Sequence, residues 1–378
     1  MIKKILRKIY NLCKLPFRIL RHFYRKVKIS NKYKRIKRDS DNYISIQYKG
    51  AHCLVNKWVN LTKAQKKEIA SYWLVKHPKK VDFYLHEIML NIKGDYDVRY
   101  CPHNIFRMYL DDSEEYWPWI DKNYFDRHQP NIPFPETIIR NVNGCFLDHD
   151  YHLINKSEAR NIILDNLPLL IKPSIDSGQG KNIKLISKKE EVEQIFIDYS
   201  KDYLLQKLII QCDEFKKISP FSVASLRVIT GIINGEVKLL KKHLLVNTSN
   251  AIAVNSGDDA GAGVVVIPLY DNGKLYDYAY KEDASKLNVL PSGESFGGIQ
   301  IPNYDKLIKY CLDAHASMPF LDFVGFDVTV DENNEPCFIE WNQRKTDVYH
   351  IQLTGGPLFG EDTDYFINKL KIALKNRK

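Results

Sequence analysis

The chain has 378 residues, of which 44% are hydrophobic and 12% aromatic. This length and composition indicate a globular protein of two or three packed units rather than one small core. We expect no membrane-spanning helix, because no run of about 18 apolar residues occurs, and no secretory signal, because basic residues interrupt each apolar stretch near the N-terminus. The 7 cysteines are scattered without a C-x-x-C pair, which favours a reducing cytoplasm over a disulfide framework or a zinc site.

The net charge of +10 belongs to the N-terminal segment. Residues 1–38 hold 15 Lys and Arg and no Asp or Glu, so the rest of the chain carries −5. Apolar residues spaced by three and four, beginning with Ile2, Ile5 and Leu6, predict an amphipathic helix that Pro16 breaks or kinks. Such a basic helix favours contact with an anionic membrane surface. A solvated tail, a helix packed on the next domain and RNA binding are the alternatives, although no recognised RNA module is present.

The region 41–118 shows mixed elements and no motif that carries chemistry. The alternation that begins at Ile44 predicts a strand over residues 44–48. Thr62 is an N-cap signal for a helix, and another helix is expected over residues 83–89. The histidines of this region fall on separate elements, which argues against a histidine metal site.

Two pieces further on are typical of a nucleotide-binding lobe. A helix-sized piece around Lys122 is followed by a proline-bounded break and a strand. A later strand delivers Lys172 to a loop that contains Ser177, Gly178 and Gly180, which we call the glycine loop. Glycines let backbone N–H groups approach phosphate oxygens closely, and the lysine adds a point charge. No helix starts after the loop, so it is neither a Walker loop nor a Rossmann turn; a plain glycine-rich hairpin is the alternative.

The Asn234-Gly235 turn predicts a hairpin over residues 225–243. Arg227 lies on its first strand, and Lys242 lies at the end of its second strand. A buried strand over residues 203–211 precedes this hairpin and ends in a segment suited to form a hinge. A polar loop over residues 255–263, long enough to touch a ligand, follows it.

A second hairpin, with strands over residues 324–330 and 336–341, is joined by an Asn- and Asp-rich turn. Asp327 lies in its first strand, and Glu340 and Asn342 end its second strand on one face. We call these three residues the metal trio, because such hard oxygen ligands suit Mg²⁺, which proteins hold with one or two carboxylates while phosphates fill other positions. An ordinary hairpin with solvated carboxylates is the alternative.

In chain order, these motifs resemble the ATP-grasp superfamily. The matching residues, from the first lysine to the metal trio, are Lys122; Lys172, Ser177, Gly178 and Gly180; Gln206, Lys207 and Leu208; Arg227; Asn255; and Asp327, Glu340 and Asn342. Several segments also resemble one branch, the sugar-transfer-associated ATP-grasp proteins of bacterial polysaccharide gene clusters. These segments lie near residues 121, 135, 171, 225 and 356, and the resemblance covers residues 115–365.

The resemblance implies an α+β protein in which two α+β lobes clamp ATP. The expected parts are a basic amphipathic arm, an N-terminal α/β region, a central ATP-grasp lobe and a C-terminal ATP-grasp lobe with the metal site, over residues 1–40, 41–118, 119–208 and 209–378. It also implies that Lys122, Lys172 and the glycine loop contact the phosphates of ATP. The hinge residues Gln206, Lys207 and Leu208 would line the adenine pocket, and Asn255 would also lie at the nucleotide.

The resemblance further implies that the metal trio holds Mg²⁺, and that Arg227 and Lys242 act in catalysis by neutralising the transferred phosphoryl group. The chain departs from the superfamily pattern at two positions. Trp341 replaces the small residue often found between the metal-binding Glu and Asn, and Gly325 stands where many peptide ligases carry an arginine. Arg227 must then carry more of the phosphate charge, or the chemistry differs from that of those ligases.

The implied activity is an ATP-dependent carboxylate–amine ligase that forms an amide through an acyl-phosphate. We expect its substrates to be a sugar acid of a bacterial capsule or O-antigen and an amino acid or amine, and we expect no nucleic acid partner. The expected location is the cytoplasm, peripheral on the inner face of the cell membrane. The alternatives are an ATP-grasp kinase that phosphorylates a sugar hydroxyl and a nucleotide-binding scaffold without turnover.

Overall fold

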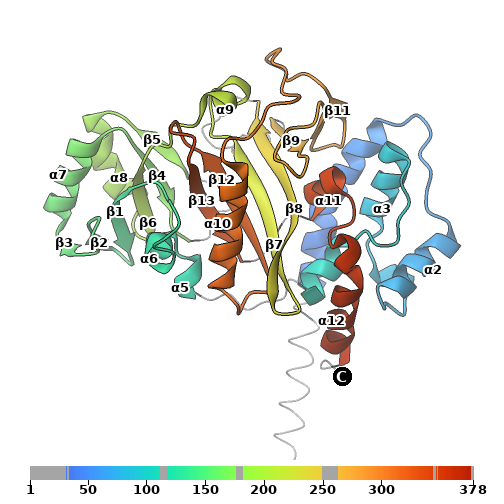
Figure 1. The fold of residues 1–378 in the computed structure, drawn as a ribbon. Coiled ribbons are helices and arrows are strands. Elements are labelled where there is room, and N and C mark those ends of the chain that lie inside the picture. The colour runs from blue at the N-terminus through green and yellow to red at the C-terminus, as the bar shows by residue number, and fades with distance from the viewer. Residues whose placement is uncertain are drawn as a thin grey trace, which may run out of the picture.

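The computed structural model describes residues 31, 34–110, 117–175, 182–248, 263–343, 346 and 348–375. The expectations for the glycine loop, for Asn255 and for nearly all of the basic arm lie outside these residues. Two antiparallel sheets and a group of N-terminal helices make up the described chain, from one side of the molecule to the other (Figure 1).

The first sheet has six strands in the order β3-β2-β1-β6-β4-β5. Its strands are β1 (Thr137–Val142), β2 (Cys145–Leu147), β3 (Leu153–Ile154), β4 (Leu169–Pro173), β5 (Lys184–Ile186) and β6 (Tyr203–Lys207). The helices that pack against it, with the short turn that opens the second, are α7 (Lys156–Asn166), η6 (Lys189–Glu191) and α8 (Val192–Asp198). Asn155 caps α7 in a capping box with Glu158, which fixes where this helix begins.

The second sheet has seven strands in the order β11-β10-β9-β8-β7-β12-β13. Its strands are β7 (Ser225–Ile233), β8 (Glu236–Asn247), β9 (Val264–Pro268), β10 (Ala279–Lys281), β11 (Lys286–Leu287), β12 (Phe323–Val330) and β13 (Pro336–Asn342). Both hairpins expected from the sequence are present, since β7 pairs with β8 and β12 pairs with β13. The short helix α9 (Asp213–Ile218) precedes β7.

Helices cover both faces of the second sheet (Figure 1). On one face, Phe326 and Val328 pack with α10 (Tyr304–Ala316) in a common apolar cluster. On the other face, Phe323 and Ile229 pack with the C-terminal helices and with the N-terminal region. The C-terminal elements are α11 (Tyr349–Gly355), η7 (Gly360–Asp362) and α12 (Thr363–Lys375).

The N-terminal region is helical where the structure describes it. Its elements after the first helix, up to the first sheet, are α2 (Lys63–Tyr72), η1 (Pro78–Lys80), α3 (Tyr84–Ile88), η2 (Met89–Lys93), α4 (His103–Ile105), η3 (Phe106–Leu110), α5 (Trp117–Ile120), η4 (Lys122–Tyr124) and α6 (Phe125–His128). The N-cap expected at Thr62 is confirmed, since Thr62 and Gln65 form a capping box at the start of α2. None of the described helices is both long and apolar enough to cross a membrane.

The strand predicted over residues 44–48 is wrong. Residues 34–53 are helical instead. Ile44 and Ala51 are fully buried and Tyr48 packs beside them, so the apolar positions follow a spacing of four and three. Ile46, which the alternating pattern would have buried with Ile44, is 64% exposed.

Candidate nucleotide and metal site

Two of the metal trio face each other across the β12–β13 hairpin. Its pairing runs from Val330 opposite Pro336 to Val328 opposite Phe338 and then skips Ile339, so that Asp327 lies opposite Glu340. Asn342 lies opposite Gly325, two residues further along each strand and therefore on the same face. The β-bulge at Ile339 thus brings the trio together, at a position where bulges commonly occur, next to a candidate site.

A second bulge decides which side chain of β8 accompanies Arg227. Counting back from the Asn234-Gly235 turn without interruption would place Arg227 opposite Lys242. Leu240 is skipped instead, so Arg227 lies opposite His243 and Lys242 lies opposite Val228. Lys242 therefore projects from the other face of the sheet, where it pairs with Asp271. The expectation that Lys242 lies beside Arg227 is wrong for this geometric reason, and its part in catalysis stays a prediction.

Arg227 holds Asp327 with two hydrogen bonds. Its Nε lies 2.6 Å from one carboxylate oxygen of Asp327 and its Nη2 lies 2.9 Å from the other. The Asn342 amide nitrogen also donates to Asp327, at 3.3 Å. Burial raises the pKa of Asp327, and the Arg227 guanidinium opposes this effect. A bidentate pair of this kind orients the two side chains relative to each other across the neighbouring strands β7 and β12.

Two lysines from the first lobe reach the same cluster. Lys122 Nζ lies 3.3 Å from a carboxylate oxygen of Glu340. Burial lowers the pKa of Lys172 to about 8. The charge of Lys122 is the second cause, and the charge of Glu340 acts in the other direction. Burial disfavours ionisation of Glu340 as well, but Lys122, Lys172 and Arg227 outweigh it and hold the pKa of Glu340 below its ordinary value. Three cations therefore face two carboxylates between the two sheets.

The chemistry of these donors fits a divalent cation and phosphate groups. Two carboxylates and one amide on one strand face supply hard oxygen ligands, which is the donor set that Mg²⁺ takes in nucleotide sites. The cations Lys122, Lys172 and Arg227 supply N–H donors to anionic oxygens. The backbone N–H of Lys122 donates to the carbonyl oxygen of Ser174 at 3.0 Å, which ties the Lys122 segment to the chain that continues from Lys172.

The hinge residues differ in what they present. The Gln206 amide nitrogen donates to Thr137 Oγ1 at 2.9 Å, so this side chain points into the first sheet. Lys207 Nζ donates to the carbonyl oxygen of Asn166 at 3.0 Å. Leu208 is 39% exposed and begins the segment that passes to the second sheet. The Gln206 side chain therefore supports β1, and any contact of this segment with adenine falls to its backbone and to Leu208.

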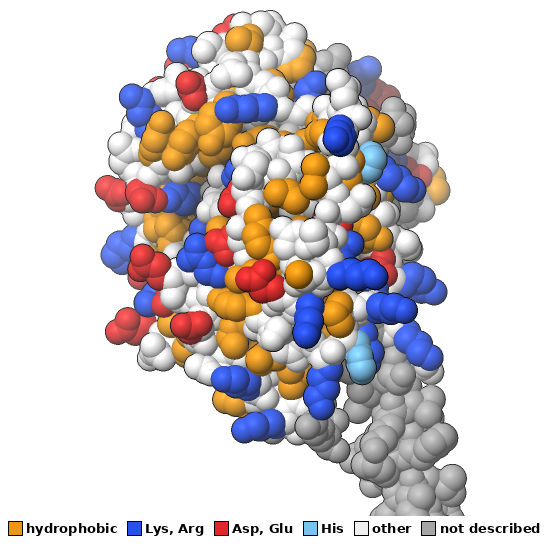
Figure 2. Space-filling model, turned by 90° about the vertical axis from the view of Figure 1, so that its right-hand side faces the viewer, with side chains coloured by type: hydrophobic (Ala, Val, Ile, Leu, Met, Phe, Trp, Pro, Cys, Tyr) orange, Lys and Arg blue, Asp and Glu red, His pale blue; other side chains and the backbone are white. Residues whose placement is uncertain are grey.

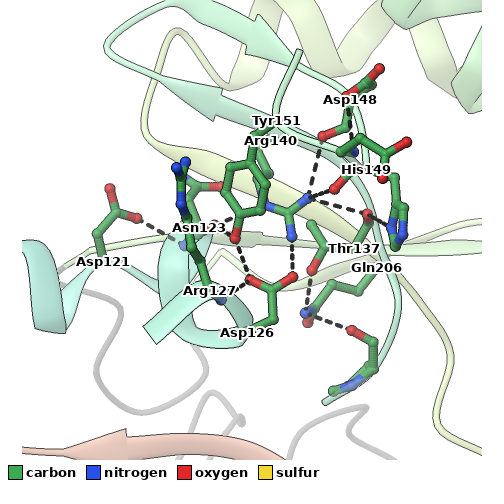
Figure 3. A network of polar contacts seen from close by, with 12 residues as sticks. Asp121, Asn123, Asp126, Arg127, Thr137, Arg140, Asp148, His149, Tyr151 and Gln206 are labelled. Atoms are coloured by element: carbon green, nitrogen blue, oxygen red, sulfur yellow. Dashed lines mark hydrogen bonds and ion pairs between the residues drawn. The ribbon is translucent and has the colours of Figure 1, made fainter. Parts of the chain in front are cut away.

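The structure also contains a buried polar network that the sequence analysis missed (Figure 3). Arg140 lies inside β1, is 0% exposed, and forms an ion pair with Asp126. Its guanidinium stacks over the Tyr151 ring, 4.1 Å from the ring centroid. An arginine directly after Ile138 and Ile139 in the strand Thr137–Val142 was a usable signal, because charged residues are rarely fully buried unless paired.

The two sheets with a nucleotide-type site between them define an ATP-grasp fold. The chain matches the family described as "Sugar-transfer associated ATP-grasp" over residues 106–363, which is more than half of its length. The chain therefore belongs to the sugar-transfer-associated ATP-grasp family, and both the resemblance and the fold class expected from the sequence are confirmed. A search of curated proteins found no match.

Several solved structures are similar to this chain. An ADP complex of N5-carboxyaminoimidazole ribonucleotide synthetase has 12% identity and a TM-score of 0.42, with 66% of this chain and 52% of that chain covered. An ATP-analogue complex of biotin carboxylase from Campylobacter jejuni has 12% identity and a TM-score of 0.42, with 68% and 46% covered. An L-amino acid ligase from Bacillus licheniformis has 14% identity and a TM-score of 0.38, with 68% and 48% covered. The match thus spans about half the length of each of these chains.

Proposed function

We propose that this protein is an ATP-dependent carboxylate–amine ligase. The observation that supports this most directly is the cluster in which Lys122, Lys172 and Arg227 face the carboxylates of Asp327 and Glu340. Such a cluster balances the charge of a polyphosphate and a divalent ion within one small volume. Membership of the ATP-grasp family supports the use of ATP.

Each group of the cluster has a proposed role. The metal trio would hold Mg²⁺, which supplies neutralisation of phosphate charge and orientation of the transferred phosphoryl group. Lys122 and Lys172 would bind phosphate oxygens of the nucleotide. Arg227 would turn from Asp327 toward the transferred group and stabilise the charge that develops on it. None of these residues forms a covalent intermediate, because positioning and charge neutralisation supply the catalysis.

The proposed reaction has two steps. A substrate carboxylate oxygen attacks the γ-phosphorus of ATP, the bond between the β- and γ-phosphates breaks, and ADP leaves. The amine of the second substrate then attacks the carbonyl carbon of the acyl-phosphate. A C–N bond forms, the C–O bond to phosphate breaks, and the amine loses a proton as inorganic phosphate departs.

The proposed carboxylate is a sugar acid of a bacterial capsule or O-antigen polysaccharide, and the proposed amine belongs to an amino acid or a related compound. The description of the family as associated with sugar transfer supports this substrate class.

The experiment that tests the activity measures ADP release from Mg·ATP with uronic acids and amino acids, singly and in pairs. We expect ADP and free phosphate only when both a carboxylate and an amine are present. Glu340→Gln should abolish ADP formation, because it removes the charge from one metal ligand. Glu193→Gln, on the exposed face of α8, is the control and should retain full turnover.

Other outcomes would contradict parts of the proposal. A phosphorylated sugar hydroxyl as product would make the protein a kinase. Nucleotide binding without ADP release under any pairing would make it a scaffold. Undiminished turnover by Glu340→Gln would refute the metal assignment.

We also propose that the protein is peripheral on an anionic membrane. The basic arm, residues 1–38, supports this on sequence, and a second basic surface lies on the folded N-terminal region. Residues 57–80 contain 7 Lys and 1 Glu, and Lys and Arg side chains gather on this side of the molecule (Figure 2). The exposed lysines of this surface, which we call the basic face, are Lys57, Lys63, Lys67, Lys76, Lys79 and Lys80. The exposed apolar residues Leu54 and Val59 lie close to Lys57 in the chain.

A further inference from the structure

We propose that Arg140, Asp126 and Tyr151 form a positioning device for Lys122. This inference rests on one part of the proposed function, that Lys122 binds a nucleotide phosphate. Among the contacts of the described residues, none joins these three side chains to Lys172, Arg227 or the metal trio. They hold Asn123, the residue that follows Lys122, and so fix the position of the backbone from which the Lys122 side chain extends.

The carbonyl oxygen of Asn123 accepts two side-chain hydrogen bonds. Arg140 Nε donates to it at 2.8 Å, and the Tyr151 hydroxyl group donates to it at 3.1 Å. The Asn123 side chain donates to the carbonyl oxygen of Asn141 at 3.1 Å. The residue next to Lys122 is thereby held to β1 at both its backbone and its side chain (Figure 3).

The donors are in turn held by a carboxylate and by the strand's surroundings. Asp126 forms the ion pair with Arg140, and its other oxygen accepts from the Tyr151 hydroxyl group at 2.5 Å. Arg140 Nη1 donates to three carbonyl oxygens at 3.2–3.4 Å, those of Thr137, Asp148 and His149. A fully buried guanidinium is costly unless its donors are satisfied. These contacts satisfy it, which makes the group rigid.

The geometry transmits this rigidity to the nucleotide cluster. Asp121 caps the turn η4 by accepting from the backbone N–H of Asn123 at 3.0 Å. Lys122, between them, donates its own backbone N–H to Ser174, two residues beyond Lys172. Lys122 is therefore fixed relative to both β1 and the end of β4, and its ammonium group reaches Glu340 of the other sheet. These contacts fix the backbone from which the Lys122 side chain extends, so less conformational freedom is lost when that side chain binds phosphate.

A double-mutant cycle on ATP binding tests the proposal. The single variants Asp126→Asn and Tyr151→Phe each remove one member of the network and leave Arg140 in place. Binding of a fluorescent ATP analogue to the full chain is measured for each, alone and together with Lys122→Met. In the wild-type background we expect each variant to weaken binding by about threefold to thirtyfold. In the Lys122→Met background we expect the same variants to change binding by less than twofold.

The cycle distinguishes positioning from a general structural effect. A loss of the same size in both backgrounds would overturn the inference and leave the role of Lys122 intact. Unchanged binding by Lys122→Met alone would refute the phosphate role of Lys122, and the inference with it. Glu193→Gln breaks an exposed ion pair with Arg160 in the same lobe and should change neither background. Thermal melting of each variant identifies any that fails to fold, and Tyr151→Phe, the smaller change, then carries the test.

Discussion

The charge of Lys172 depends on pH in a range that can be measured. Its surroundings lower its pKa to about 8, chiefly through burial. Below that pH the ammonium form dominates and attracts phosphate, and above it the neutral form grows. ATP affinity should therefore fall by about tenfold between pH 7 and pH 9. Equilibrium binding of an ATP analogue across this range checks the prediction.

Two variants separate Lys172 from other titrating groups. Lys172→Met should bind the analogue more weakly at pH 7 and should lose the step near pH 8. Lys184→Met removes an exposed lysine from the neighbouring strand β5 and should keep the step. A step that persists in Lys172→Met would assign the pH dependence to another group.

Close packing around position 325 explains why a glycine stands there. A Cβ atom added there would lie 3.3 Å from Ile229 Cδ1, 3.3 Å from Thr346 Cγ2 and 3.8 Å from Arg227 Cδ. The space that the side chain of an arginine at position 325 would need is thus already filled, in part by Arg227. That Arg227 carries more of the phosphate charge, or that the chemistry differs from that of those peptide ligases, remains a prediction.

Gly325→Ala should therefore lower the free energy of unfolding by about 1 kcal/mol, and Gly325→Arg by more, because both overpack a filled site. Urea unfolding monitored by tryptophan fluorescence measures the change. Ile229→Val removes the Cδ1 atom, so the cost of Gly325→Ala should shrink in that background. An equal cost in both backgrounds would show that Ile229 is not the obstacle.

At the scale of elements, the hairpins show how far the sequence could lead. Turn residues predicted both hairpins, and the alternation of side chains placed Glu340 and Asn342 on one strand face. The two bulges were not predicted. A skipped residue shifts the alternation by one, and the adjacent apolar residues Leu239-Leu240 and Phe338-Ile339 stand where the shifts occur. Adjacent apolar residues also occur in an uninterrupted strand that is buried on both faces, so they did not identify a bulge. Leu240 is skipped where Gly231 leaves room, since a Cβ there would lie 2.8 Å from Leu240 Cδ1. This extra residue in β8 places Lys242 on the sheet face opposite to that of Arg227.

The sequence did not predict the helix over residues 34–53 or the Arg140 network, and the reasons differ. Alternation over five residues near Ile44 could not be told from a short part of a helical pattern, and only tertiary packing decided between them. Arg140 could be recognised from the sequence as a charged residue within a predicted strand. Its partners Asp126 and Tyr151 come from separate elements, however, and their convergence depends on the fold.

The capping box at the start of α2 gives a test at this scale. The Thr62 hydroxyl accepts from the backbone N–H of Gln65 at 3.2 Å, and the Gln65 side chain accepts from the backbone N–H of Thr62 at 2.9 Å. Thr62→Ala should reduce the free energy of unfolding by about 1 kcal/mol. Thr62→Ser keeps the acceptor and should cost much less. Chemical denaturation of both variants decides, and equal losses would argue that the methyl group, not the cap, matters.

At the scale of the whole molecule, the charge distribution predicts membrane binding. Four lysines of the basic face changed together to Glu should weaken binding to phosphatidylserine vesicles by roughly 100-fold or more, since each contributes about 1 kcal/mol near the surface. The four are Lys63, Lys67, Lys79 and Lys80. Sedimentation of the full chain with vesicles measures the effect.

The matched control reverses four exposed lysines elsewhere on the molecule. These are Lys188, Lys189, Lys216 and Lys217. This control should bind vesicles as the wild type does. If it lost as much affinity as the basic-face variant, net charge alone would explain the effect. A chain that begins at Asp39 measures the separate contribution of the arm, and unchanged binding by that chain would rule the arm out. Tighter binding to RNA than to vesicles would favour a nucleic acid partner instead.

The ion pair between Lys122 and Glu340 joins the two lobes, because one residue is anchored on the first sheet and the other belongs to the second. A phosphate that binds Lys122 and a metal ion that binds Glu340 would each have to break this pair. Whichever breaks it also frees the partner for the other, so the two ligands would be thermodynamically coupled. The protein would then respond to the metal–nucleotide complex and discriminate against either component alone.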